Sequence, residues 1–249
     1  MQWFLAHTDD VLRLSALHLY QSVLPLLIGV LIALPLAQLV RGRRKIRGFV
    51  LSAGSLLYTI PSLALFVTLP AILGTRILDL ANIIVALTIY AVALMLRVAV
   101  DAFDSVDEGV RQAAVAMGYR PVRRFLTVDL PLSVPVLIAG LRVVSVSNIS
   151  MVSVGALIGV ENLGFFFSDG LRRFFLTEIV VGILATLVLA FVMDLFFVLL
   201  QRGLTPWLRA GKGSRGTARS DGGDGGTGPA EPQRPEPVAI APDAALKGA

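Results

Sequence analysis

The stretch DEGVRQAAVAMGYRPVRRFLTVDLP, residues 107–131, is a polar, arginine-bearing segment between long apolar runs. Apolar residues recur in it at helical spacing, at positions 106, 110, 113, 114 and 117, with charged and amide residues on the opposite side. This pattern predicts an amphipathic helix. Gly118 stands where a helix can end in a left-handed turn, and Pro121 is placed to open a second short helix. We therefore expect a helix, a glycine turn and a helix, facing water as a docking element.

The composition of the chain is that of a membrane protein. Its 249 residues are 55% hydrophobic and only 16% charged, far from an ordinary soluble domain. Cysteine is absent, so we expect neither a disulfide framework nor a thiolate metal or redox site. The net charge of +5 could indicate nucleic acid binding, but the basic residues gather just beyond apolar segments, as membrane topology requires. The prediction is an all-α polytopic membrane protein that contacts lipid and no nucleic acid.

Five apolar runs are each long enough to cross a bilayer core of about 30 Å as a helix. They lie at about 19–40, 51–73, 81–103, 132–158 and 177–200. The first ends at the basic block 41–47, which is costly to translocate and predicts a cytoplasmic loop with the N-terminus outside. Thr8, Asp9 and Asp10 can cap a helix ahead of this run, and we expect no removed signal peptide. The predicted fold is about five transmembrane helices, N-out and C-in.

Three regions follow from these runs. Residues 1–18 form an external N-terminal segment, and residues 19–202 form a transmembrane domain with a cytoplasmic loop at 104–130. From Gly211 onward the chain is rich in glycine, proline and serine with almost no aromatic residue, so it cannot bury enough apolar surface to fold. We assign residues 203–249 to a disordered cytoplasmic tail.

The spacing within the central stretch matches a family pattern. Two alanines follow Gln112, Gly118 comes four residues after the second, and a Val-x-Leu-Pro ends at Pro131. This order resembles the EAA loop of the permeases of ATP-binding-cassette (ABC) importers, in which Glu usually takes the first position and Ile the place of the valine. The resemblance implies the type I importer transmembrane fold and a coupling helix that docks the ATP-binding subunit. It gives this coupling role to Gln112, Ala113, Ala114, Gly118, Arg120 and Pro131.

Close packing is the physical reason for such a pattern. Two adjacent alanines and a glycine one turn later leave a smooth patch, which lets the groove of a partner approach the backbone. An ordinary amphipathic surface helix would explain the alanines and the glycine alone, since these residues are common. It would not explain the full spacing through Leu-Pro between two membrane spans.

Three further stretches, 58–65, 120–142 and 156–164, resemble the permeases of osmoprotectant importers for glycine betaine, carnitine, choline or proline. Glu161 and Asn162 stand where that family usually has two glycines. The resemblance implies a second permease subunit, identical or a sister chain, two ATP-binding subunits inside and a solute-binding protein outside. It places the chain in the bacterial cell membrane and makes it a transport subunit, with ATP hydrolysed by a separate partner.

Ionisable residues inside the spans are functional candidates, because a charge in hydrocarbon costs several kcal/mol unless it is paired or hydrated. Arg97 and Asp194 lie at similar depths, and we expect them to pair in a structural role. Arg142 lies too deep for easy snorkelling, so we expect it to face the interior or a cavity. A self-contained secondary transporter or channel is the alternative to an importer, and these three residues are the only plausible coupling groups for it. A membrane scaffold is a third alternative.

Uncharged polar residues also interrupt the spans, where they line a water-filled route or join helices by hydrogen bonds. The candidates for the translocation path are Tyr58, Pro61, Ser62, Arg142 and Asn148. We expect His18 to be an interfacial polar residue, and residues 165–167, three phenylalanines, to be an interfacial anchor or a receptor contact. Neither histidine has a partner at metal-ligand spacing and no catalytic arrangement appears, so no enzyme activity, metal or cofactor is expected.

Overall fold

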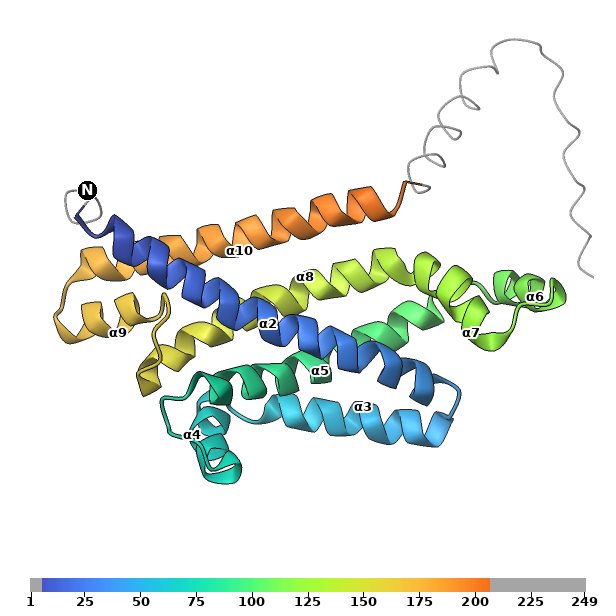
Figure 1. Cartoon of the computed structure of the whole chain (residues 1–249), viewed down its shortest axis with the longest axis horizontal. Helices are drawn as coiled ribbons and strands as arrows, with labels where there is room; N and C mark the ends of the chain where they lie inside the picture. The colour runs from blue at the N-terminus through green and yellow to red at the C-terminus, as the bar shows by residue number, and fades with distance from the viewer. Residues whose placement is uncertain (1–5, 207–249) are drawn as a thin grey trace, which may run out of the picture. The chain divides into compact units, whose positions relative to one another are not determined.

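A computed structural model describes residues 6–206 of the chain, and the elements in this part are helical (Figure 1). The helices are α2 (Thr8–Arg41), α3 (Arg44–Thr59), α4 (Ser62–Leu73), α5 (Leu80–Asp104), α6 (Glu108–Ala116), α7 (Pro121–Arg124), α8 (Leu130–Val154), α9 (Phe165–Arg172) and α10 (Leu176–Leu204). A π-helical turn, Phe125–Asp129, joins α7 to α8, and a 3-10 turn, Gly155–Ile158, follows α8. Of the predicted tail, residues 207–249 lie outside the described residues.

Helices α2, α5, α8 with its flanking turns, and α10 are each long and apolar enough to cross a membrane. Helices α3 and α4 make a fifth crossing segment if the two are taken together as one bent span. The predicted all-helical membrane fold with about five spans is therefore confirmed.

The first span is one continuous helix that begins well before the predicted boundary at residue 19. It starts at Thr8, with His7 at the cap position and no side-chain hydrogen bond to the exposed amides, so the predicted cap is wrong. Asp9 and Asp10 lie instead in the first turn, where the helix dipole favours negative charge. No helix-breaking residue separates Thr8 from the apolar run, and prolines within a membrane helix are tolerated when neighbouring helices satisfy the backbone.

The second predicted span is bent by 99° between α3 and α4. The break falls at Ile60 and Pro61, because proline disfavours helical geometry in the residue before it. The hydroxyl of Tyr90 on α5 donates to the carbonyl of Ile60 at 2.6 Å, which satisfies an acceptor that the break exposes. Pro70, by contrast, sits within α4 without ending it.

Helix α5 is the centre of the packing, in contact with α2, α3, α4 and α8. Small residues allow close approach: a Cβ added at Gly29 of α2 would lie 2.6 Å from the Cβ of Ala91 on α5. Half of the most apolar stretch of α5 is buried within the chain, but only 6% of that of α10. Most of the α10 surface is therefore left for lipid, water or another chain.

The two ends of the bundle carry different elements. Helices α6 and α7 project at one end, while α9 and the start of α2 lie at the other (Figure 1). The central stretch of the sequence and the segment that follows α8 therefore face opposite sides of the membrane that α8 crosses.

Candidate coupling loop and membrane-embedded polar groups

The loop between α5 and α8 has the helix, glycine turn and helix that its sequence predicts. The side chain of Asp107 caps α6 by accepting a hydrogen bond from the amide of Val110 at 3.1 Å. After α6 the chain turns at Gly118, whose φ of +81° is in the left-handed region that favours glycine. Pro121 is the first residue of α7, where its missing N–H costs nothing.

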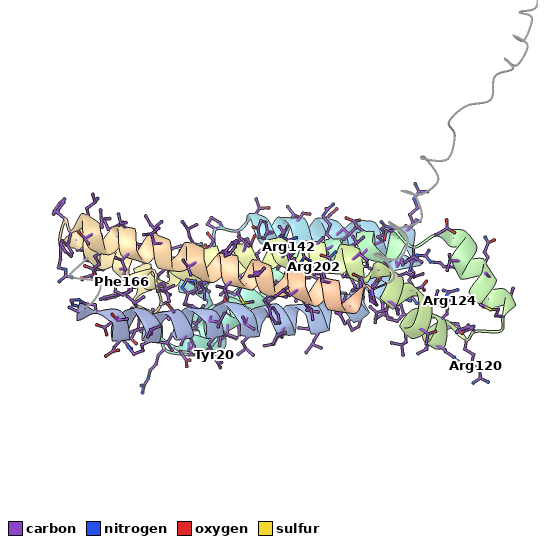
Figure 2. The ribbon with its side chains drawn as sticks, turned by 90° about the horizontal axis from the view of Figure 1, so that it is seen from above. Tyr20, Arg120, Arg124, Arg142, Phe166 and Arg202 are labelled. Carbon is purple, nitrogen blue, oxygen red and sulfur yellow. The ribbon has the colours of Figure 1, made fainter. Side chains whose placement is uncertain are left out.

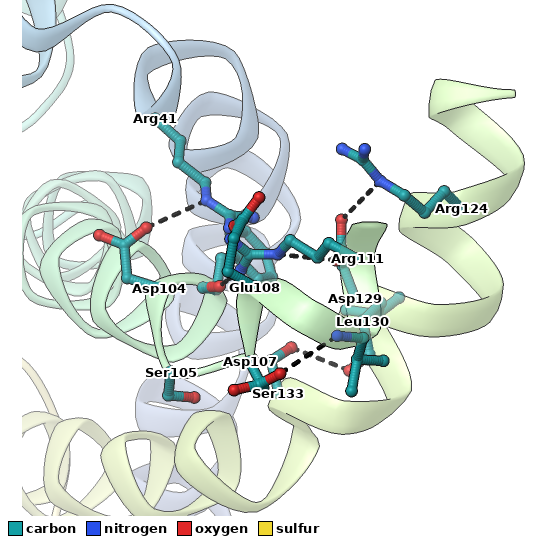
Figure 3. Close-up of polar contacts among 12 residues, drawn as sticks. Arg41, Asp104, Ser105, Asp107, Glu108, Arg111, Arg124, Asp129, Leu130 and Ser133 are labelled. Atoms are coloured by element: carbon teal, nitrogen blue, oxygen red, sulfur yellow. Dashed lines mark hydrogen bonds and ion pairs between the residues drawn. The ribbon is translucent and has the colours of Figure 1, made fainter. Parts of the chain in front are cut away.

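Arg111 holds this loop against the membrane helices (Figure 3). The sequence pattern places Arg111 on the water-facing side of α6, but its guanidinium turns inward. Its Nε donates to Oδ1 of the fully buried Asp129 at 3.2 Å, and its Nη2 donates to the carbonyl of Phe103. Glu108 and Arg124 complete the cluster, with Glu108 accepting from Arg111 at 3.2 Å and Arg124 lying 3.5 Å from Asp129. Helix α6 is thus tied to the last turn of α5 and to the start of α8.

Asp104 joins the ends of three helices by ion pairs, beside the same loop. Its Oδ1 accepts from Nε of Arg41 at 3.0 Å, and its Oδ2 pairs with Nη1 of Arg47 at 2.7 Å. These residues belong to α5, α2 and α3, so the basic block at 41–47 lies at the α6 end of the bundle. The candidate coupling loop therefore lies beside a set of helix ends that are joined by ion pairs.

The outward surface of the loop includes an open apolar face beside its charged residues. Val122 is 72% exposed, and other exposed apolar side chains on the loop are Val110, Val115, Met117 and Leu126. Gln112 and Ala113 also face outward, but Ala114 is buried against the rest of the chain. The smooth patch expected from the sequence therefore contains Ala113 and the glycine turn, while Ala114 supports the helix from inside.

The remaining coupling candidates lie at the tip and the base of the loop. Arg120 is exposed at the far tip (Figure 2). Pro131, by contrast, is half-buried in the first turn of α8. A Cβ added at Gly118 would meet no atom within 4 Å, so this position is open to a partner. A shallow groove of about 290 Å³ runs between α6 and α7 and is lined by Glu108, Arg111, Gln112, Val115, Ala116 and Arg124.

Three of the path candidates come together at the bend between α3 and α4. Tyr58 lies just before the bend, Pro61 forms it, and Ser62 begins α4. The ring of Tyr58 packs edge-on against that of Tyr90, with 5.7 Å between ring centroids. The bend is therefore a defined structure, and Tyr58 remains partly exposed on its surface.

Arg142, not Arg97, is the partner of Asp194. Nε and Nη2 of Arg142 donate to the two carboxylate oxygens of Asp194 at 2.6 and 2.7 Å, in a bidentate pair between α8 and α10. Arg97 instead donates to the hydroxyl of Ser55 on α3 at 3.1 Å. The predicted pairing of Arg97 with Asp194 is therefore wrong, because the two side chains leave their helices toward different neighbours.

Asn148 and His18 are buried and join α8 to α2. Nδ2 of Asn148 donates to the carbonyl of Ser22 at 3.3 Å, so the structure favours the helix-joining role for this residue. Nε2 of His18 lies 2.9 Å from the carbonyl of Ile149, and its Nδ1 accepts from the amide of Leu163. Since a carbonyl only accepts and an amide only donates, His18 carries its proton on Nε2. The prediction of an interfacial His18 is wrong.

The segment around α9 forms the other end of the bundle. Phe166 is buried in a cluster with α2, whereas Phe165 is partly exposed, so the three phenylalanines do not act as one interfacial anchor. The carboxylate of Glu161 accepts from Nη1 of Arg13 at 2.6 Å. Asn162 donates to the carbonyl of Val152 at 2.9 Å, so it fixes the loop after α8.

Between α9 and α10, Nη2 of Arg173 donates to the buried carboxylate of Glu178 at 2.7 Å. This hydrogen bond and the negative charge raise the pKa of Arg173, which therefore stays charged. Within the part of the chain that the structure describes, no three His, Cys, Asp or Glu side chains gather as a metal site would require.

Comparison with known proteins identifies this arrangement. A model of the family "Binding-protein-dependent transport system inner membrane component" matches residues 26–210. The chain belongs to this family. It is a multi-pass permease subunit of an ABC transporter in the inner membrane, and a transport component without a catalytic role of its own. The predicted ABC permease is confirmed over a secondary transporter, channel or scaffold.

Individual proteins similar to this chain are also transport permeases. This permease is 29% identical over 209 residues to the osmoprotectant import permease protein OsmW of Salmonella typhimurium, which covers 83% of this chain and 97% of OsmW. It is 30% identical over 189 residues to the carnitine transport permease protein OpuCB of Listeria monocytogenes, covering 76% of this chain and 85% of the relative. A chain of the MetNI methionine ABC transporter in an inward-facing conformation matches with a TM-score of 0.68 at 21% identity, over 78% of this chain and 96% of that chain. The last likeness confirms the type I fold.

Proposed function

We propose that this permease forms half of the translocation path of an importer for a small osmoprotectant such as glycine betaine, carnitine, choline or proline. The observation that carries the proposal is the relationship to osmoprotectant and carnitine permeases along most of the chain. A second permease subunit, identical or a sister chain, supplies the other half. The family name itself implies a binding-protein partner for this chain.

The loop from α6 to α7 docks the ATP-binding subunit in this proposal. An exposed apolar surface at Val122 and Leu126 suits burial against a partner. The adjacent basic block at 41–47 supports a cytoplasmic position for this end, by the rule that basic loops stay inside. The start of α2 is then outside and the end of α10 inside.

Movement of the ATPase subunits reaches the membrane through ion pairs. Arg111 joins α6 to the end of α5 and, through Asp129, to the start of α8. A displacement of the docked loop therefore displaces the two helices with it. ATP shifts the equilibrium between inward-facing and outward-facing states only by its different affinity for the two.

The translocation path includes the bend between α3 and α4 and the open side of α8. Tyr58, Pro61 and Ser62 meet at the bend, where irregular backbone is tolerated if it lines a cavity. Arg142 faces a groove on α8 rather than the packed interior. In this proposal the bend and the groove each supply polar groups that the solute contacts during transport.

Uptake by reconstituted protein tests the proposal. The permease, its co-expressed ATP-binding subunit and the binding protein are placed in proteoliposomes with labelled glycine betaine, carnitine, choline or proline. We expect ATP-dependent uptake of at least one of these solutes that requires the binding protein. Uptake of none of them, or transport by the permease alone down a gradient, would contradict the proposed function.

A further inference from the structure

The ion pair of Arg142 and Asp194 lies within the membrane spans α8 and α10. Arg142 is the central residue of α8 (Leu130–Val154), so it stands about 18 Å from each end of the helix at about 1.5 Å per residue. Figure 2 shows it between Arg120 at one end and Phe166 at the other. The guanidinium cannot reach water at either surface by extending its side chain.

This pair is open on one side of the chain. The side chains of Arg142 and Asp194 are 36% and 33% exposed. They border a groove of about 420 Å³, which is within the size range of small-molecule sites and is also lined by Ala139, Val143, Val146 and Ser147. Pairing removes much of the cost of these two charges in the membrane, but each side chain is still about one-third exposed, and contact of exposed charged groups with hydrocarbon is unfavourable. We therefore infer that this side of α8 and α10 faces water or another polar surface in the membrane.

The opposite side of α10 has the character expected of a lipid-facing surface. There α2 and α10 form a groove of about 790 Å³ lined by apolar side chains such as Val188 and Val192, with Ser15 and Thr177 as its hydroxyl-bearing residues. Val192 is two residues from Asp194 and therefore points to the other side of the helix. Helix α10 thus separates an apolar surface from a charged one at the same depth.

We propose that the groove at Arg142 and Asp194 holds a zwitterionic solute in transit, with its carboxylate on Arg142 and its cationic group on Asp194. This inference rests on the proposed function and adds a solute site to it. Guanidinium binds carboxylate in a planar, bidentate geometry, which the pair already shows internally.

A zwitterion is the class of solute that can bind between these two side chains without leaving either of them unpaired. When it enters, one internal ion pair is replaced by two pairs between solute and protein, and neither protein charge is left alone in the membrane. An uncharged solute cannot separate the pair, and a solute with a single charge leaves one side chain unmatched. Because the internal pair re-forms on departure, the solute is also released readily, as transport requires.

Thiol labelling tests whether the groove is wet and occupied. The sequence contains no cysteine, so an introduced thiol is the only one in the chain. Ser147→Cys places it in the groove, and Val192→Cys is the matched control on the apolar side at similar depth. The permease with its ATP-binding subunit, in lipid nanodiscs, is treated with a water-soluble trimethylammonium-ethyl methanethiosulfonate, which reacts with the thiolate.

We expect Ser147→Cys to react at least about ten-fold faster than Val192→Cys, and glycine betaine but not glycerol to slow the reaction about ten-fold, as an added charge-assisted contact would. Equal rates at the two positions, or no slowing by glycine betaine, would overturn the proposal. The uptake measured with the wild-type protein distinguishes a wrong solute site from a wrong proposed function. If wild type takes up glycine betaine but the thiol is not shielded, only the site is wrong, whereas absence of all osmoprotectant uptake removes the proposed function itself.

Charge variants distinguish a solute site from a structural latch. Arg142→Gln leaves a lone carboxylate, so uptake of choline relative to glycine betaine should rise about ten-fold, while Asp194→Asn should shift the ratio the other way. A latch would lower the uptake of both solutes in parallel in both variants. The double variant leaves no unpaired charge and should assemble even where a single variant does not. On the Ser147→Cys background it should abolish shielding by glycine betaine, and retained shielding would overturn the proposal.

Discussion

Replacing Asp129 by leucine should loosen the coupling loop from the membrane helices. The carboxylate is fully buried, 3.2 Å from Nε of Arg111 and 3.5 Å from Nε of Arg124. Loss of one member of a buried pair costs about 3–5 kcal/mol. Arg111 keeps the carbonyl of Phe103 and the exposed Glu108, so we expect about 2–4 kcal/mol. For a chain of this size that is a fall of about 4–16 °C in the unfolding midpoint.

A double-mutant cycle isolates the contribution of the pair. Arg111→Met combined with Asp129→Leu leaves neither charge buried alone, so the double variant should be more stable than the sum of the single changes by about 1–3 kcal/mol. The midpoints are measured by thermal unfolding of the purified complex in detergent. Arg47→Ala, which removes a more exposed ion pair at the same end of the bundle, is the control and should cost less than about 1 kcal/mol. Strict additivity of the two single changes would refute the coupling of α6 to α8 through this pair.

Three other changes test the packing by the same thermal assay. Gly29→Ala should cost about 1–3 kcal/mol by overpacking α2 against α5, with partial rescue by Ala91→Gly; no loss of stability would contradict the close approach. His18→Leu should cost about 1–3 kcal/mol because it leaves a buried amide ahead of α9 without an acceptor, and a neutral effect would place His18 at the surface. Tyr90→Phe should cost about 1–3 kcal/mol by stranding the carbonyl of Ile60, whereas an unchanged midpoint would show that water or lipid headgroups satisfy this carbonyl.

Local backbone preferences made the coupling loop predictable. Gly118 adopts the left-handed turn and Pro121 opens α7 because these residues restrict the backbone wherever they occur. Apolar length likewise predicts the spans, since a helix must satisfy its own backbone in lipid. The inward turn of Arg111 was not predictable from helical spacing, because its partner Asp129 lies beyond the next turn and helix.

The side-chain pairs between helices could not be predicted from the sequence, and the reason is geometric. Depth in the membrane can be counted along a helix, and by that count Arg97 and Asp194 match. The direction in which a side chain leaves the bundle depends on how each helix is rotated against its neighbours. Arg97 turns toward α3, and Asp194 forms its ion pair with Arg142 of α8. His18 is buried for the same reason, since α2 presents it to α8 rather than to the membrane surface.

Copurification of the ATP-binding subunit shows whether the turn between α6 and α7 docks it. Gly118→Asp and Gly74→Asp form a matched pair, because both glycines have positive φ, +81° and +68°, and an added Cβ meets nothing within 4 Å at either. Both variants therefore place a side chain at a left-handed position in open space, and only the first position lies in the proposed docking surface. We expect wild type and Gly74→Asp to retain the ATP-binding subunit and Gly118→Asp to lose it. Equal retention by both variants, or no association with wild type, would contradict it.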